Sequence, residues 1–150
     1  MADTSVQTGV ERWVRSVWLP REYGCSFYRD GVRLTCGGVH SFGAVSGDGQ
    51  LIASISTSSA MTPGGKRGAG KLLKIRSDMY FMLLAEDVDQ RLILFTEPDM
   101  LELCEEERAR GKVPDSIRFR WVGLPQELVE RLTAARRVAS REVNPRRREG

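Results

Sequence analysis

The strongest chemical signal in this 150-residue chain is a glycine-rich basic stretch at residues 65–71, GKRGAGK. It matches the first seven positions of a phosphate-binding loop, Gly-x-x-x-x-Gly-Lys, whose backbone N–H groups cradle phosphate. The eighth position is Leu72, where such a loop carries a hydroxyl that holds magnesium. The stretch also follows a Ser/Thr/Pro-rich loop instead of a buried strand. We therefore interpret it as a glycine-rich lead into a basic helix and do not expect a nucleotide site.

A row of basic residues runs through the helix predicted for residues 66–84. These residues occur without an intervening acid, which is unusual in a chain this rich in acids. Unpaired N–H groups at a helix start favour anions, as do nearby Lys and Arg side chains. The row predicts a surface that binds a phosphate backbone, and the alternative is a merely solvated helix face. Its members are Lys66, Arg67, Lys71, Lys74 and Arg76.

The element that would position this helix is a strand-turn-strand over residues 39–56, VHSFGAVSGDGQLIASIS. Asp48-Gly49 favours a two-residue type I′ turn, because both central residues of that turn need positive φ. This register sets Gly43 opposite Ser54, whereas a three-residue loop would shift it by one. Alternation then predicts a core face and a small, largely polar face. The core face carries Phe42, Ala44, Leu51, Ala53 and Ile55, and the polar face Ser41, Gly43, Val45, Ile52, Ser54 and Ser56.

The N-terminal third of the chain predicts one helix and an antiparallel meander. Apolar residues recur at helical spacing over residues 6–19, and Pro20 is expected to close the helix. Residues 25–29 and 32–36 have the pattern of short strands around an Asp30-Gly31 turn. A second turn then leads into the hairpin over residues 39–56.

The rest of the chain predicts alternating strands and helices. The apolar run at residues 91–95 is typical of a strand buried on both faces. Thr96 begins a Thr-x-x-Asp helix start, residues 117–121 alternate as a strand, and a last helix runs over 125–141. We expect an α/β (α+β) fold: an αβββαβ core with a mixed central sheet flanked by helices, then a further helix, strand and helix. We expect one domain over residues 1–143, followed by a basic disordered tail over 144–150.

Cysteine and histidine usage argues against metal binding. Cys25, Cys36 and Cys104 have no metal-ligand spacing, and His40 is the only histidine, so a Cys/His zinc site is nearly excluded. An Asp30-Gly31 turn would set Cys25 opposite Cys36 and make a disulfide geometrically conceivable, but we expect both to stay reduced. We expect no metal, no cofactor, and a packed His40 instead of a general base.

The charge and hydropathy patterns limit which kinds of partner this protein can have. The net charge of +3 hides an acidic stretch at residues 86–107, which should repel phosphate, and a basic C-terminus. No apolar run approaches the roughly 18 residues of a membrane helix, and the N-terminus lacks the regions of a signal peptide. We expect a cytoplasmic protein with no membrane partner.

The predicted order helix-strand-strand-strand-helix-strand, with a hairpin whose neighbouring strands present paired side chains, resembles the PD-(D/E)xK nuclease superfamily, the restriction-endonuclease-like fold. The resemblance covers residues 6–95. It implies an aspartate on the second core strand and Glu-x-Lys on the third, which hold magnesium and orient water for phosphodiester cleavage. Those positions fall on Gly43, Ser54 and Ser56. The resemblance therefore implies a degenerate member that lacks the metal-binding acids and has no catalytic residues at these positions.

Three functions are compatible with these patterns. The first is a non-catalytic nuclease-fold domain that binds DNA or another phosphate-bearing partner through its basic helix. The second is a protein-interaction or assembly module, self-associating through an acidic region and the basic tail of a neighbour. The third is a magnesium-dependent nuclease with relocated acids. The nearby acids are Glu11, Glu22, Asp30 and Asp48, and loss of cleavage in Glu11→Ala or Asp30→Ala is the expected test. Scarce aromatic residues argue against base-specific recognition.

Overall fold

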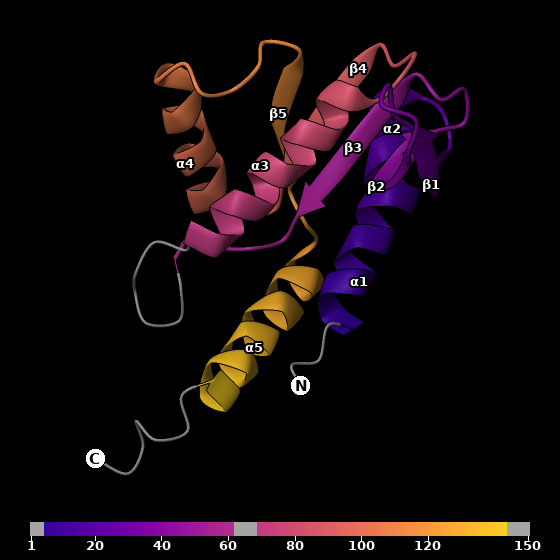
Figure 1. Ribbon diagram of the computed structural model, residues 1–150. Coiled ribbons are helices and arrows are strands. Elements are labelled where there is room, and N and C mark those ends of the chain that lie inside the picture. Colours follow the sequence, from indigo (N-terminus) through magenta and orange to yellow (C-terminus); the bar gives the residue numbers. More distant parts are fainter. Residues whose placement is uncertain (1–4, 62–68, 144–150) are drawn as a thin grey trace.

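The expected helices and strands are present in the computed structural model, which describes residues 5–61 and 69–143, with side chains described as far as residue 138 in the last helix (Figure 1). The αβββαβ order followed by helix, strand and helix is the one that the sequence predicts, and the α/β class is confirmed. In chain order the described elements are α1 (Ser5–Trp13), the π-helical turn η1 (Val14–Trp18), α2 (Leu19–Tyr23), β1 (Phe27–Arg33), β2 (Val39–Ser46), β3 (Leu51–Ser56), α3 (Ala69–Leu84), β4 (Gln90–Phe95), α4 (Pro98–Ala109), β5 (Ile117–Trp121) and α5 (Gln126–Val143).

The described strands form one mixed five-stranded sheet in the order β1-β2-β3-β4-β5. β1, β2 and β3 are antiparallel neighbours, whereas β3, β4 and β5 run parallel. Parallel neighbours need a crossover connection, and α3 and α4 provide the two that this sheet requires. β3 and the end of β4 are buried on both faces, as the apolar run at residues 91–95 predicts.

Helices cover both faces of the sheet, so that the chain has two cores (Figure 1). α3 and α4 cover one face, where Ile52 and Ile93 are fully buried. α1 and its continuation cover the other face together with α5, and there Ala53 and Leu92 are fully buried. Each buried Ile or Leu side chain contributes about 1.5–3 kcal/mol relative to an exposed one. Packing against a shared sheet therefore sets where α1 and α3 stand relative to the end of β3.

The turn between β2 and β3 differs from the expected type I′ turn. Of its two expected positive-φ residues only Gly49 has one, at 76°, and Gly49 N donates to Ser46 O over 2.8 Å. The carboxylate of Asp48 accepts hydrogen bonds from Ser46 Oγ (2.6 Å) and Gln50 N (3.0 Å). These bonds stabilise a wider loop in which Asp48 keeps negative φ. The type I′ expectation is therefore wrong, although the wider loop preserves the expected register.

A β-bulge changes which side chains of β2 share a face. Ala44 pairs with Ala53, as predicted, but the pairing with β1 shifts by one residue between Tyr28 and Asp30. Because β2 has this extra residue, side chains that precede the bulge point to the opposite face from the one that regular alternation predicts. Phe42 consequently packs in the core under α3 and α4, and its predicted place on the Ala44 face is wrong.

The prediction that one face of the hairpin is small and polar is also wrong, because that face is buried in a second core. Val45 is buried there together with Ile52, and Ser54 is only 9% exposed. α3 and α4 cover this face, which the alternation of a single hairpin does not reveal. Only the last residue of β3, Ser56, leaves the buried sheet and is partly exposed.

The first helix continues beyond Pro20 to Tyr23. Its middle is the π-helical turn, in which Leu19 N donates to Val14 O. Pro20 then lies in the first turn of α2, where the missing N–H of proline needs no partner. Gly24 ends the helix with φ 69° and donates to Pro20 O over 2.9 Å. The expectation that Pro20 closes the helix is therefore wrong.

Asp30 and Gly31 lie within the continuous strand β1 and do not form a turn. The chain reverses later, where Leu34 N donates to Gly38 O over 2.8 Å. Cys25 and Cys36 therefore flank opposite ends of β1 instead of facing one another. Both are exposed free thiols, so the alternative of a cross-strand disulfide is wrong.

Candidate functional site

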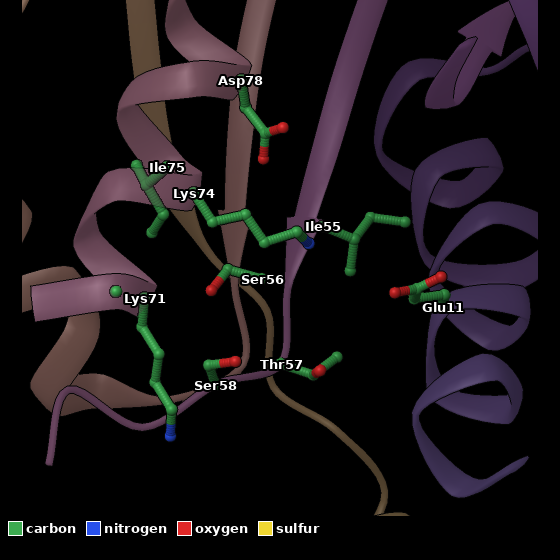
Figure 2. Close-up of a pocket in the computed structure, with 10 residues that line it drawn as sticks. Glu11, Ile55, Ser56, Thr57, Ser58, Lys71, Lys74, Ile75 and Asp78 are labelled. Carbon is green, nitrogen blue, oxygen red and sulfur yellow. The ribbon is translucent and has the colours of Figure 1, made fainter. Parts of the chain in front are cut away.

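A pocket of about 170 Å³ lies where β3 ends, between α1 and α3 (Figure 2). Parallel β3 and β4 both end on this side of the sheet, and the chain leaves β3 here through a run of hydroxyl residues. Three elements supply polar side chains to the pocket. These are Glu11 from α1, Ser56 with the following Thr57 and Ser58 at the end of β3, and Lys71, Lys74 and Asp78 from α3.

Helical spacing brings the α3 side chains to the pocket. Lys71, Lys74 and Asp78 follow one another at three- and four-residue steps and so share one side of the helix. Ile75 also lines the pocket but is buried, and it anchors α3 on the sheet. Figure 2 shows Lys74 extending from α3 across the pocket, with the Glu11 carboxylate reaching in from α1. Lys71 and Lys74 of the predicted basic row thus both line the pocket, as their shared side of the helix predicts, although their side chains extend in different directions in Figure 2.

Neither pocket lysine forms a close ion pair with a described residue. Among the described side chains, the Lys71 and Lys74 ammonium groups take part in no ion pair or hydrogen bond. Asp78 interacts electrostatically with Lys74 from one turn further along α3 but does not form a close ion pair with it. Both lysines therefore retain donors for a ligand.

The other residues of the basic row are not at the pocket. Arg76 points to α4 and donates to Glu107 Oε2 over 3.0 Å. Glu107 is only 7% exposed, so this ion pair joins two packed helices and Arg76 is occupied. Lys66 and Arg67, with most of the glycine-rich stretch, lie outside the described residues, as does the predicted tail at residues 144–150.

The three positions that the nuclease resemblance singles out do not converge in the pocket. Ser56 lines it, but Ser54 is buried in the sheet. A Cβ atom at Gly43 would lie 3.6 Å from Ala53 O, and the Gly43 carbonyl accepts a hydrogen bond from Arg15 Nη1 at 2.9 Å. A guanidinium thus occupies the neighbourhood in which a nuclease would place a carboxylate. No group of three potential metal ligands occurs among residues 5–61 and 69–143.

The acids that could form a relocated metal site lie in different parts of the structure. Glu11 lines the pocket, whereas Asp30 lies in edge strand β1 and its carboxylate accepts a hydrogen bond from Gly31 N at 2.8 Å. Asp78 is a pocket acid that sequence reasoning missed. Its signal was present in the sequence, because Asp78 stands four residues after Lys74 on a helix whose basic side had been recognised.

Burial raises the pKa of Asp78, and the charges of Lys74 and His40 partly oppose that rise. His40 itself is packed, as expected: its ring stacks on Phe81 with centroids 4.1 Å apart and meets Phe42 edge-on at 4.8 Å. Protonation of Asp78 would remove one negative charge from the pocket, and burial makes this protonation easier than in an exposed aspartate.

Arg136 of α5 fixes the wall of the pocket. Its guanidinium donates to the carbonyl of Thr57 and, over 2.7 Å, to Glu97 Oε1. Thr96 Oγ1 donates to the other Glu97 oxygen over 3.1 Å, and Thr96 N donates to Ser56 O over 3.1 Å. The end of β3 is thereby tied to β4 and to α5, two elements far away in the sequence.

Thr96 and Asp99 do not form the helix start that the sequence predicts for them. α4 begins at Pro98, and the Thr96 hydroxyl lies 3.3 Å from Ser56 O instead of capping the helix. Asp99 Oδ2 accepts hydrogen bonds from Ser59 Oγ (2.5 Å) and Ala60 N (3.1 Å). The predicted capping motif is wrong, because its polar groups hold the segment after β3.

No protein-family model matches this chain, and neither the curated proteins nor the solved structures compared with it yield a match. None of the described helices combines the length and the apolar character that a bilayer span requires. Function is therefore inferred from the pocket and its chemistry.

Proposed function

We propose that this protein is a non-catalytic domain that binds nucleic acid, or another phosphate-bearing partner, at the pocket between α1 and α3. The observation that carries the proposal is a pair of lysines, Lys71 and Lys74, that form no close ion pair with a described residue. They line the pocket beside the hydroxyl residues at positions 56–58. Ammonium and hydroxyl groups are donors that phosphate oxygens accept from.

We propose that this domain is a degenerate member of the PD-(D/E)xK nuclease superfamily. The αβββαβ order supports it, as does an antiparallel hairpin whose second strand, β3, is followed through a helix by the parallel strand β4. The lack of a carboxylate at Gly43 and Ser54 supports the non-catalytic part of the proposal, since magnesium prefers charged oxygen ligands. Three free cysteines agree with a reducing compartment, and we propose the cytoplasm.

Fluorescence anisotropy with labelled duplex and single-stranded oligonucleotides tests the proposal. Affinity should be highest near 50 mM salt and fall as salt rises, because phosphate contacts release counterions. Combined Lys71→Ala and Lys74→Ala should weaken binding and reduce the slope of log affinity against log salt by about 1.4 to 1.8, for two lost contacts.

Lys112→Ala is the matched control, because Lys112 is exposed beyond α4 and does not line the pocket. It should leave the affinity nearly unchanged. The proposal fails if the wild-type protein binds no oligonucleotide at about 50 mM salt, where phosphate contacts are strongest. It also fails if the double variant binds as tightly as Lys112→Ala.

A second candidate function is metal-dependent phosphodiester cleavage, which the shared pocket of Glu11, Asp78 and Lys74 favours. Magnesium is commonly bound through one or two carboxylates together with substrate phosphates. This candidate predicts magnesium-dependent nicking of supercoiled DNA that Glu11→Ala abolishes and that Asp30→Ala, outside the pocket, leaves intact. Nicking that persists in a chelator, or no nicking at all, would eliminate it.

A further inference from the structure

The pocket offers acceptors as well as donors. Glu11 and Asp78 face it together with Lys71 and Lys74, and ionised carboxylates can only accept hydrogen bonds. Neither acid accepts a hydrogen bond or forms an ion pair with a described residue. A groove that only tracks phosphates would gain nothing from two carboxylates, since each repels the phosphate charge. A fitting ligand must therefore bring hydroxyl or amine donors to the acids while its phosphate meets the lysines.

The size and lining of the pocket narrow the ligand further. Its volume of about 170 Å³ is well below the roughly 300 Å³ at which pockets begin to enclose drug-sized molecules. It is lined by polar and aliphatic residues, and no described aromatic side chain is there to stack on a base. The pocket therefore suits a sugar-phosphate unit better than a whole nucleotide.

We infer that the pocket recognises the ribose-phosphate unit of RNA, with either Glu11 or Asp78 accepting the one hydrogen bond that the 2′-hydroxyl donates, while Lys71 and Lys74 contact the phosphate. The inference rests on the proposed function and names its ligand class. Ribose carries the 2′-hydroxyl donor and deoxyribose lacks it, which is the chemical difference that lets a protein separate RNA from DNA. An acidic side chain that accepts from a ribose hydroxyl beside a phosphate site is a recurring solution in nucleotide-binding proteins.

The surroundings of Asp78 agree with this role. Burial raises its pKa, which means that its ionised form lacks sufficient solvation in the free protein. The charged or titratable groups around it are Lys74 on its own helix, His40 from β2 and Glu11 from α1 across the pocket. A ligand hydroxyl would supply part of the missing solvation.

Binding of matched single strands to the full-length protein tests the inference. RNA, DNA and 2′-O-methyl RNA of one sequence are compared by anisotropy at about 50 mM salt, with a chelator present so that neither metal binding nor cleavage contributes. We expect RNA to bind about tenfold more tightly than DNA, the effect of one hydrogen bond to a charged group. 2′-O-methyl RNA keeps the ribose ring without the donor, so it should bind as weakly as DNA.

Two isosteric variants assign the preference to the acids. Glu11→Gln or Asp78→Asn, whichever removes the accepting carboxylate, should reduce the ratio of RNA to DNA affinity. Both variants should leave DNA binding equal or tighter, because repulsion of phosphate is removed. Circular dichroism checks that each variant is folded. Unchanged RNA preference in both would overturn the inference.

The remaining outcomes distinguish failure of the ribose inference from failure of the proposed phosphate-binding function. Equal binding of RNA and DNA, or RNA-like binding of 2′-O-methyl RNA, overturns the ribose inference and leaves phosphate binding standing. No binding of any strand overturns the proposed function itself. Ribose 5-phosphate serves as a competitor: a strand affinity at least tenfold above that of the sugar phosphate supports RNA, whereas equal affinities overturn RNA in favour of the free sugar phosphate.

Discussion

The guanidinium of Arg15 lies 2.9 Å from the carbonyl oxygen of Gly43, which joins the π-helical turn of the first helix to the bulged part of β2. Gly43 lies between the paired residues Phe42 and Val45 that flank the irregularity, and Arg15 lies within the π turn. The positive charge of the guanidinium beside this carbonyl disfavours a metal ion there. Gly43 thus offers no carboxylate to a metal ion, and its carbonyl is already bonded to a cationic side chain.

Loss of the Arg15 contact should destabilise the protein. Arg15→Ala is expected to lower the free energy of unfolding by about 1.5 kcal/mol, the lower end for a hydrogen bond with one charged partner. Arg12→Ala is the control, because Arg12 is exposed on the same helix. Urea denaturation measures both, and equal unfolding midpoints for the two variants would contradict this assignment.

Arg136 should stabilise the pocket wall at a distance in the sequence. Arg136→Ala removes the contacts to Thr57 and Glu97, and we expect a loss of about 2 kcal/mol because a half-buried carboxylate is left without its partner. Arg137→Ala, at an exposed neighbouring position, should stay within about 0.5 kcal/mol of the wild type. A double-mutant cycle with Glu97→Gln should show strong non-additivity, and additive losses would argue that the pair does not interact in solution.

The hairpin loop offers a matched pair of glycines. Gly49 has φ 76°, so Gly49→Ala should cost about 1 kcal/mol through the left-handed conformation. Gly47 has no positive φ, and an added Cβ would meet only ordinary contacts at 3.9 Å. Gly47→Ala is therefore expected to be neutral or stabilising by up to about 1 kcal/mol. Thermal unfolding of both variants checks the difference, and equal unfolding temperatures for the two would contradict it.

Asp78 should make stability fall as pH rises. Its pKa is raised above the ordinary 3.8 by burial, so the folded state binds the proton more tightly than the unfolded state. The protonated acid's contribution is complete below pH 3.8 and is lost as pH rises through the higher, folded-state pKa. Asp78→Asn should therefore be more stable than the wild type at neutral pH, with the difference vanishing below pH 3.8. A difference that grows toward acid pH would contradict the shift.

The three thiols should react at very different rates. Burial, with Glu107 and Glu105 nearby, raises the pKa of Cys104 to about 11, whereas Cys25 and Cys36 are exposed. Since the thiolate is the reactive form, a thiol reagent at neutral pH should modify two cysteines quickly and the third only after denaturation. Cys104→Ser should leave the fast phase unchanged. Rapid labelling of all three in the folded protein would show that Cys104 is accessible.

Regular periodicity made much of the fold predictable. Two-residue alternation and helical spacing were sufficient for the αβββαβ order, the buried run at residues 91–95 and the final strand. The hairpin register was also predictable, although the turn was not, because a two-residue loop and the wider loop at Asp48 give the same pairing. Local irregularities escaped prediction, since the bulge in β2 and the π turn depend on which neighbour the backbone meets.

The sequence by itself determined that Lys71, Lys74 and Arg76 belong to one basic helix. Only the tertiary structure decided which of them remain available to a ligand. α3 packs on the sheet beside α4, so Arg76 pairs with the buried Glu107 of α4 while the two lysines line the pocket at the end of β3. Helical spacing sets the direction of a side chain about its own axis, but the partner it meets there depends on a residue 31 positions away.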